Sequence, residues 1–118
     1  MRTNIEKGKL GEKIAEEYLV AQGYKILEKN FRIRTGEIDI IAIKNKILVF
    51  VEVKARTSTY YGHPYEAVNR EKQMKIMRTA LYYMSLKNMH YYQPRFDIVE
   101  VYIGHDKRIN HIDNAFSM

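Results

Sequence analysis

The chain has 118 residues, of which 46% are hydrophobic, and this is enough for a single domain around one core. It contains no cysteine, which excludes disulfide bonds and thiolate metal sites. Lysine and arginine outnumber aspartate and glutamate by 20 to 14, and the formal net charge of +6 favours a polyanionic partner such as nucleic acid.

The first predicted element is an amphipathic helix over Gly8–Gln22. Its apolar residues recur at helical spacing and form one face, which consists of Leu10, Ile14, Ala15, Tyr18 and Leu19. Gly11 lies within this face, where a small residue permits close packing, and Gly23 is suited to end the helix. Glu12 borders the face that packs on the sheet, whereas Glu16 is turned further toward solvent.

Three strands are predicted next, over Tyr24–Arg32, Glu37–Ile43 and Ile47–Lys54. A Thr-Gly pair at positions 35 and 36 is a turn signal between the first two strands. Asn45 suits the short turn before the third strand, because asparagine tolerates the left-handed backbone that such a turn needs.

A polar, tyrosine-rich loop is predicted over Ala55–His63, followed by a helix that begins after the N-cap Asn69 and ends near Lys87. The expected buried stripe of this helix consists of Met74, Met77, Leu81 and Met84. A strand over Phe96–Ile103 and a short last element over Ile109–Ala115 complete the chain. This order of elements predicts an α/β domain with a central sheet.

The second and third strands form a predicted hairpin whose register places several ionisable residues together. If the strands pair across a two-residue turn at positions 45 and 46, Asp39 faces Glu52 and Glu37 faces Lys54 on the same side of the sheet. The opposite side is wholly apolar and consists of Ile38, Ile40, Ala42, Val49, Val51 and Val53.

Two directly opposed carboxylates repel each other, and something has to offset this repulsion. Mg²⁺ or Mn²⁺ does so naturally, because such ions prefer oxygen ligands and are commonly held by one or two carboxylates together with water and phosphate. Lys54 is placed to stabilise charge on a phosphate, or to orient or deprotonate a metal-bound water. The same pattern is also consistent with an ion network that joins Glu37 to Lys54 and Asp39 to Arg32 or Arg34.

Residues 36–42 (GEIDIIA) and 49–56 (VFVEVKAR) resemble the signature of the PD-(D/E)xK nucleases, with Asp39 as the aspartate and residues 52–54 as the (D/E)xK element. More closely, the chain resembles the YraN family of small bacterial proteins, which are similar to Holliday junction resolvases. That family shows a helix beginning G-x-x-G-E-x-x-A, here supplied by Gly8, Gly11, Glu12 and Ala15. The similarity continues to YGHP at 61–64 and NAF at 114–116. Ile38 stands where the superfamily's name has proline, as is usual in this family.

The resemblance implies a restriction-endonuclease-like α/β fold, with a central mixed sheet flanked by helices, as a single nuclease-like domain over residues 1–118. It implies that Asp39 and Glu52 are the central metal ligands and that Lys54 is the catalytic lysine that faces the phosphate. Glu12 would join the metal site directly or through water, the alternative being a solvated helix charge. Glu37 is an additional carboxylate that supports the site or simply pairs with Lys54.

Substrate contacts are expected from two segments. The candidates in the loop after the third strand are Arg56, Tyr60, Tyr61 and His63. Arginine there would touch phosphate and tyrosine would stack on bases, although loop tyrosines more often serve packing. The candidates at the start of the second helix are Lys72, Gln73 and Lys75. These would contact phosphates without reading sequence, or form a solvated helix face.

The resemblance points to hydrolysis of phosphodiester bonds in DNA, branched or single-stranded, with Mg²⁺ or Mn²⁺. A DNA-binding or scaffold protein that keeps the fold without turnover is the alternative, and an RNA partner is disfavoured because no RNA-binding motif is visible. A homodimer is implied by the resemblance alone. The chain begins with no apolar leader, and its longest apolar run, Ile47–Val51, is far shorter than the roughly 20 residues that cross a bilayer. We therefore expect a cytoplasmic protein without a membrane partner.

Overall fold

The computed structural model describes residues 2–57, 68–104 and 108–117. They form α1 (Asn4–Ala21), β1 (Lys25–Ile33), β2 (Gly36–Lys44), β3 (Ile47–Arg56), α2 (Arg70–Leu86), β4 (Gln93–Tyr102) and β5 (Ile109–Phe116). No helix in this described part of the chain is long and apolar enough to span a membrane.

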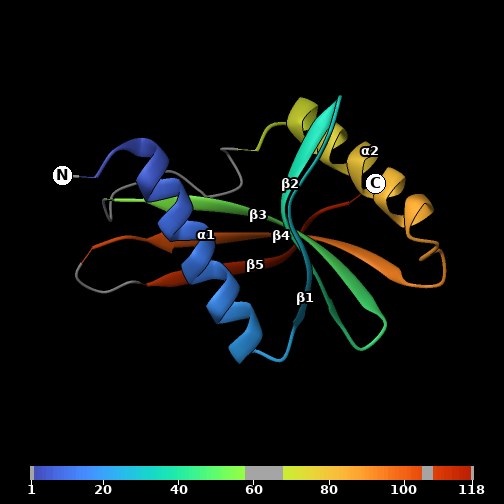
Figure 1. Cartoon of the computed structure of the whole chain (residues 1–118), viewed down its shortest axis with the longest axis horizontal. Coiled ribbons are helices and arrows are strands. Elements are labelled where there is room, and N and C mark those ends of the chain that lie inside the picture. Colours follow the sequence, from blue (N-terminus) through green and yellow to red (C-terminus); the bar gives the residue numbers. More distant parts are fainter. Residues whose placement is uncertain (1, 58–67, 105–107, 118) are drawn as a thin grey trace.

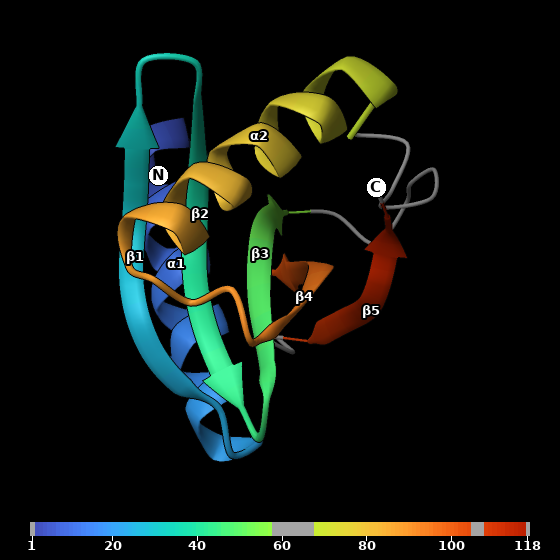
Figure 2. The same cartoon turned by 90° about the vertical axis from the view of Figure 1, so that its right-hand side faces the viewer.

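The five strands form one mixed sheet in the order β1-β2-β3-β4-β5. Neighbouring strands are antiparallel except for β3 and β4, which are parallel and have α2 in the connection between them. Helix α1 covers one face of the sheet and α2 covers the other (Figure 1, Figure 2). The prediction of an α/β architecture with a central mixed sheet flanked by helices is confirmed.

Each helix packs on its own apolar layer of the sheet. The layer under α1 contains Ile40, Ala42, Val49, Val51, Val99 and Val101. The layer under α2 contains Ile38, Ile41, Leu48, Phe50, Phe96 and Ile98. Period-two alternation along β3 therefore serves both layers, because a strand in the middle of the sheet is buried on both sides.

One residue lies on the other face from the one predicted. Ile38 was expected on the same face of the sheet as Ile40, but Ile40 packs in the α1 layer and Ile38 packs in the α2 layer. Strand β2 is strongly twisted here (Figure 1), and its ladder with β3 ends at the pair of Ile40 with Val51. Beyond that pair, β2 is paired with β1, where Ile38 is opposite Phe31 of the same α2 layer.

Helix α1 begins four residues before the predicted start because of a capping box at its N-terminus. The Thr3 hydroxyl accepts a hydrogen bond from the Glu6 amide at 3.1 Å, and the Glu6 carboxylate accepts one from the Thr3 amide at 2.8 Å. This reciprocal pair satisfies two backbone donors that would otherwise lack partners.

The buried stripe predicted for α2 is half wrong. Met77 and Met84 are buried, but Met74 is 37% exposed and Leu81 is 50% exposed. The buried face instead includes Ile76, Thr79, Ala80 and Tyr83. Tyr83 determines this rotation, because its ring packs edge-on against Phe31 and Phe50, with centroid distances of 5.0 and 6.2 Å.

Strand β4 begins at Gln93, three residues before the predicted start, and includes Pro94. Pro94 is opposite Leu48 of β3, while the ladder with β5 begins only at Phe96. The missing proline N–H therefore removes no ladder hydrogen bond on the β5 side. The last predicted element, Ile109–Ala115, is confirmed as strand β5.

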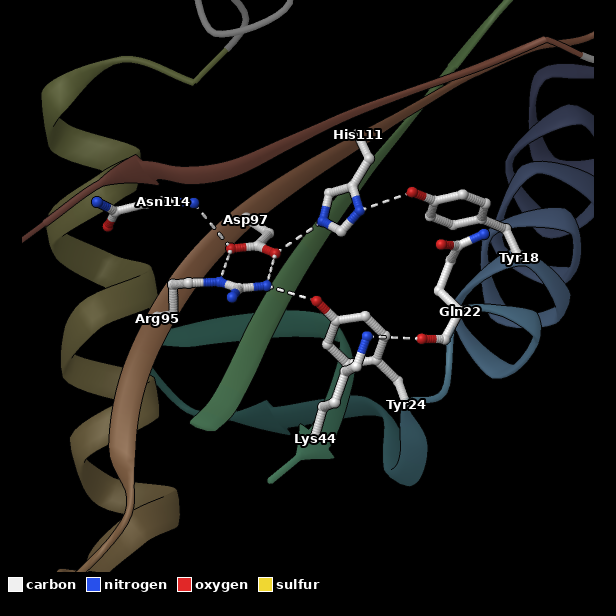
Figure 3. A network of polar contacts seen from close by, with 8 residues as sticks. All are labelled: Tyr18, Gln22, Tyr24, Lys44, Arg95, Asp97, His111 and Asn114. Carbon is white, nitrogen blue, oxygen red and sulfur yellow. Dashed lines mark hydrogen bonds and ion pairs between the residues drawn. The ribbon is translucent and has the colours of Figure 1, made fainter. Parts of the chain in front are cut away.

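A buried carboxylate network on the α1 side fastens β5 to β4 (Figure 3). Asp97 of β4 is fully buried, and its two oxygens accept hydrogen bonds from Arg95 Nε and Nη2 at 2.9 and 2.8 Å. From β5, His111 Nε2 lies 2.7 Å from the carboxylate and the Asn114 amide donates to it at 3.0 Å. Burial alone would raise the pKa of Asp97, but the hydrogen bonds from His111 and Arg95 outweigh it and lower the pKa.

The same network reaches the first helix. Arg95 Nη2 donates to the Tyr24 hydroxyl at 2.6 Å, and the Tyr18 hydroxyl lies 2.9 Å from His111 Nδ1 (Figure 3). Because Nε2 of His111 faces a carboxylate, the neutral ring carries its proton there, and Nδ1 accepts from Tyr18. Helix α1, the segment after it and both C-terminal strands are thus joined through one buried charge.

Gly11 is the point of closest approach between α1 and β3. A Cβ added at Gly11 would lie 2.9 Å from the Ala55 Cβ, whereas a Cβ added at Gly8 would meet nothing within 4 Å. We expect Gly11→Ala to lower the free energy of unfolding by about 1–3 kcal/mol, because α1 must move away from the sheet. We expect Gly8→Ala, the matched control, to raise it by about 0.5–1 kcal/mol through helix propensity. Urea denaturation of both variants measures the free energy of unfolding. An equal increase in Gly11→Ala and Gly8→Ala would contradict the close contact between α1 and β3.

Candidate functional site

The predicted hairpin register is correct up to the point where the ionisable residues begin. Ile43 is opposite Leu48 and Ile41 is opposite Phe50, as expected from the two-residue turn. The ladder ends one pair before Asp39 and Glu52, so the predicted direct opposition of these two residues is replaced by a different contact. Asp39 Oδ2 accepts a hydrogen bond from the Val53 amide of β3 at 2.8 Å.

This contact turns the Asp39 carboxylate toward β3 at the place where β2 and β3 separate. Burial raises the pKa of Asp39 to about 7, the neighbouring Glu52 adds to the rise, and the Val53 amide opposes it. The charges of Glu12 and Glu37 raise the pKa of Asp39 further. Four carboxyl groups therefore act on one another here.

Glu52 is 8% exposed and is held between two lysines. Its Oε1 lies 2.8 Å from Lys72 Nζ of α2 and 3.8 Å from Lys54 Nζ of the same strand. Burial lowers the pKa of Lys54, and the positive charge of Lys72 lowers it further, while Glu52 opposes both. Burial also acts to lower the pKa of Lys72, but the hydrogen bond to Glu52 and the charge of that carboxylate, with smaller contributions from Lys54 and Asp39, together outweigh burial and raise the pKa.

Glu12 approaches this group from α1, on the other side of the β1–β2 hairpin. It lines a neighbouring pocket of about 270 Å³ together with Lys9, Lys13, Glu16, Lys29 and Asn30. Burial raises the pKa of Glu12, a hydrogen bond with Asn30 opposes the rise, and the charges of Glu37 and Glu52 add to it. Glu12 is thus electrostatically linked to the other carboxylates although it lies in a separate pocket.

Asp39 and Glu52 line a pocket of about 150 Å³ between the sheet and α2. The remaining lining residues are Gly36, Glu37, Lys72, Lys75 and Ile76. Gly36 brings α2 close, because a Cβ there would overlap the Thr79 hydroxyl and lie 3.1 Å from the Lys75 carbonyl oxygen. The volume is several times the roughly 30 Å³ that one water takes in the liquid, so a hydrated cation or a phosphate oxygen fits.

The donor set of this pocket fits a hard divalent cation. Asp39 and Glu52 supply carboxylate oxygens, and Mg²⁺ typically takes one or two carboxylates and completes its shell with water and phosphate. Within residues 2–57, 68–104 and 108–117, no three His, Asp or Glu side chains converge into a ready-made metal cluster. Glu12 lines the separate pocket on the α1 side, so within these described residues it completes no such cluster with Asp39 and Glu52.

The predicted ion network is realised with different partners. Glu37 pairs with Arg32 of β1 at 2.8 Å and not with Lys54. The reason is that Arg32 and Glu37 are opposite each other in the β1–β2 ladder. Lys54 instead faces Glu52.

The other predicted substrate-binding residues are only partly near the pocket. Lys72 and Lys75 line it. Gln73 Nε2 donates to the Val68 carbonyl at 2.9 Å, which braces the start of α2. Arg56 Nε donates to the buried Glu100 at 2.6 Å, where it neutralises a carboxylate of β4. The proposed loop residues, Tyr60, Tyr61 and His63, lie outside the described residues.

Two features of the site were not foreseen from sequence. Lys72 was expected to face DNA, but it contacts Glu52 directly. The N-cap fixes only where α2 begins, since Asn69 Oδ1 accepts from the Lys72 amide at 2.9 Å, and the contact with Glu52 depends on how α2 packs on the sheet. The buried carboxylates of β4, Asp97 and Glu100, were also missed, although two acidic residues in an apolar strand are a signal in themselves.

Comparison with known proteins gives one consistent result. The model of "Uncharacterised protein family UPF0102" matches residues 11–101. A UPF0102 protein of Caldanaerobacter subterraneus subsp. tengcongensis is 54% identical over 113 residues, covering 92% of this chain and 93% of that protein. UPF0102 proteins of Alkaliphilus metalliredigens and Clostridioides difficile are each 50% identical, covering 92% and 96% of this chain and 96% and 98% of those proteins.

Proposed function

Since this chain belongs to the uncharacterised protein family UPF0102, which is the YraN family, we propose that it is a metal-dependent nuclease with a restriction-endonuclease-like PD-(D/E)xK fold that hydrolyses phosphodiester bonds in DNA. The observation that carries the proposal is the pocket in which Asp39 and Glu52 meet beside Lys54. The order of the residues along β2 and β3 is that of the PD-(D/E)xK signature.

The electrostatics of the pocket support a cation-binding role. Two largely buried carboxylates raise the cost of ionising each other, and the pKa of Asp39 rises to about 7 as a result of burial and of Glu52. A purely structural ion network would pair each carboxylate with its own base. Here Asp39 accepts a hydrogen bond from a neutral amide and remains beside a second carboxylate, an arrangement that a divalent cation stabilises.

In this proposal Asp39 and Glu52 hold Mg²⁺ or Mn²⁺, and Glu12 contributes through water. The bound ion would neutralise charge on the phosphate and lower the pKa of a water. Lys54 is half-buried beside Glu52, and burial lowers its pKa. Its ammonium would hold a phosphate oxygen in place or orient the attacking water, and a lowered pKa eases release of its proton.

The charge of the elements that line the pocket suits a polyanion such as DNA. Helix α2 and the β1–β2 hairpin both contribute residues to the pocket, and they carry these exposed basic side chains: Arg32, Arg34, Arg70, Lys75 and Arg78. Contacts of this kind to phosphates supply affinity without reading sequence. Branched or single-stranded DNA and a homodimer that makes two symmetric cuts remain part of the proposal through the resemblance to resolvases.

Lys54→Met tests the catalytic part of the proposal. We expect cleavage to slow by about 10²–10³-fold, the usual effect of removing one group that stabilises charge in the transition state. DNA binding in EDTA, measured by fluorescence anisotropy, should stay close to that of the wild type. Lys46→Met is the matched control, because Lys46 is exposed in the β2–β3 turn. Equal cleavage by both variants would exclude Lys54 from the chemistry.

A further inference from the structure

Lys72 reaches the pocket from the first turn of α2. Its backbone amide is fixed by the N-cap Asn69, and its side chain extends to β3, where Nζ donates to Glu52 Oε1 at 2.8 Å. This is the shorter of the two ammonium contacts to that oxygen, since Lys54 Nζ lies at 3.8 Å. Lys72 is therefore the principal neutralising charge on Glu52.

The position of this ammonium coincides with the proposed cation site. Lys72, Asp39 and Glu52 line the same pocket, so the positive charge lies in the space that faces both carboxylates. A fixed positive charge there stabilises the carboxylates as a cation would, and it also repels any cation that enters. The Lys72 ammonium and a divalent cation therefore compete for the same oxygen of Glu52.

The side chain of Lys72 borders on solvent. It is 42% exposed, whereas the Glu52 side chain is 9% exposed, so the lysine lies at the mouth of the pocket and its partner lies inside. A flexible four-carbon chain at such a boundary can turn into solvent when a divalent ion replaces it as the counter-charge of Glu52. Exposed Arg70 and Lys75 flank it on α2, on a surface suited to phosphate.

We propose that Lys72 is a built-in cation that occupies Glu52 in the metal-free protein, competes with a divalent ion for that oxygen, and turns outward to a DNA phosphate when the ion binds. This inference rests on the proposed function. It makes Lys72 a positioning residue that sets the affinity of the metal site. It also predicts that DNA and metal favour each other's binding, because a phosphate that engages the Lys72 ammonium vacates the oxygen.

The test measures Mn²⁺ affinity without DNA and without turnover, from the EPR signal of free Mn²⁺. We expect Lys72→Met to bind Mn²⁺ about tenfold or more tightly than the wild type, because one repulsive charge is removed beside a partly buried site. Lys72→Arg keeps the charge and should bind as weakly as the wild type. Lys75→Met is the matched control, since Lys75 lines the same pocket but its ion pair is with Glu71 on its own helix, at 3.7 Å.

The outcomes separate this inference from the proposed function. Tighter binding by Lys72→Met alone supports it. Equal or weaker binding by Lys72→Met, with Mn²⁺ still bound by the wild type and lost in Asp39→Asn, overturns the role of Lys72 and leaves the metal site intact. No Mn²⁺ binding by the wild type or by Lys72→Met overturns both the competition and the metal-dependent function.

Discussion

Replacing Asp39 by asparagine is expected to abolish metal-dependent DNA cleavage and, in the same protein, to stabilise the metal-free fold. Asparagine keeps the shape of the side chain and can still accept the hydrogen bond from the Val53 amide. It removes the negative charge that would hold the cation, so cleavage should fall by at least about 10³-fold. It also removes a charge that is unfavourable in this place, because burial and, after it, the repulsion with Glu52 raise the pKa of Asp39.

The stability effect has a definite dependence on pH. The pKa of Asp39 is about 7 in the folded protein, against roughly 3.9 in an unfolded chain. Between these values the folded state holds a proton that the unfolded state has lost, so the free energy of unfolding falls as the pH rises from about 4 to about 7. Above pH 7 this contribution is absent. Asp39→Asn should therefore be more stable than the wild type at pH 8, and the difference should shrink toward pH 4.

Urea unfolding in EDTA at pH 5 and pH 8 measures this difference. Asp113→Asn is the matched control, because Asp113 is exposed on β5 and its substitution is chemically identical. If the wild type and Asp39→Asn show parallel pH profiles, Asp39 has no raised pKa. In that case the carboxylates of Asp39 and Glu52 do not repel each other appreciably in the folded protein.

Asp97→Asn is expected to have the largest effect on stability. The substitution leaves the Arg95 guanidinium, only 20% exposed, without its buried counter-charge. Breaking one partner of a buried ion pair typically costs about 3–5 kcal/mol. The loss should release β5 and α1 together, since both are joined to Asp97 through His111 and Tyr18 (Figure 3).

Thermal and urea unfolding measure the loss, with Asp113→Asn again as the control. The control should stay within about 0.5 kcal/mol of the wild type, as exposed substitutions usually do. Cleavage per folded molecule at low temperature should be retained by Asp97→Asn, because Asp97 does not line the carboxylate pocket. If Asp97→Asn unfolds with nearly the same free energy as the wild type, the buried network contributes little to holding β5 and α1 in place.

The fold was predictable where patterns are local. The amphipathic face of α1 and the two apolar strands around Asn45 follow from periodicity and turn chemistry, and the turn alone fixed the pairing of Ile41 with Phe50. Asn45 has the positive φ, 57°, that the turn required. The start of β4 was missed because proline disfavours a central strand. The structure shows that β5 pairs with β4 only from Phe96 onward, so Pro94 has a strand neighbour on one side only.

The proximity of the candidate residues on β2 and β3 was predictable, but their contacts were not. Asp39, Glu52 and Lys54 could be selected from spacing, because alternation places them on one side of a hairpin. Their geometry depends on the twist of β2, which ends the ladder at Ile40 and turns the Asp39 carboxylate to the Val53 amide. Lys72 is distant in sequence, and only the packing of α2 on Gly36 brings it to Glu52.

The most direct test of the nuclease function is cleavage of labelled four-way junction, flap, single-stranded and duplex DNA, with Mg²⁺ or Mn²⁺ and with EDTA. Asp39→Asn, purified in parallel, controls for contaminating nucleases. The account predicts that the wild type cuts branched or single-stranded DNA, that EDTA stops the reaction, and that Asp39→Asn is inactive. If DNA is bound but no substrate is cut with either metal, the fold serves as a DNA-binding scaffold and the nuclease function is contradicted.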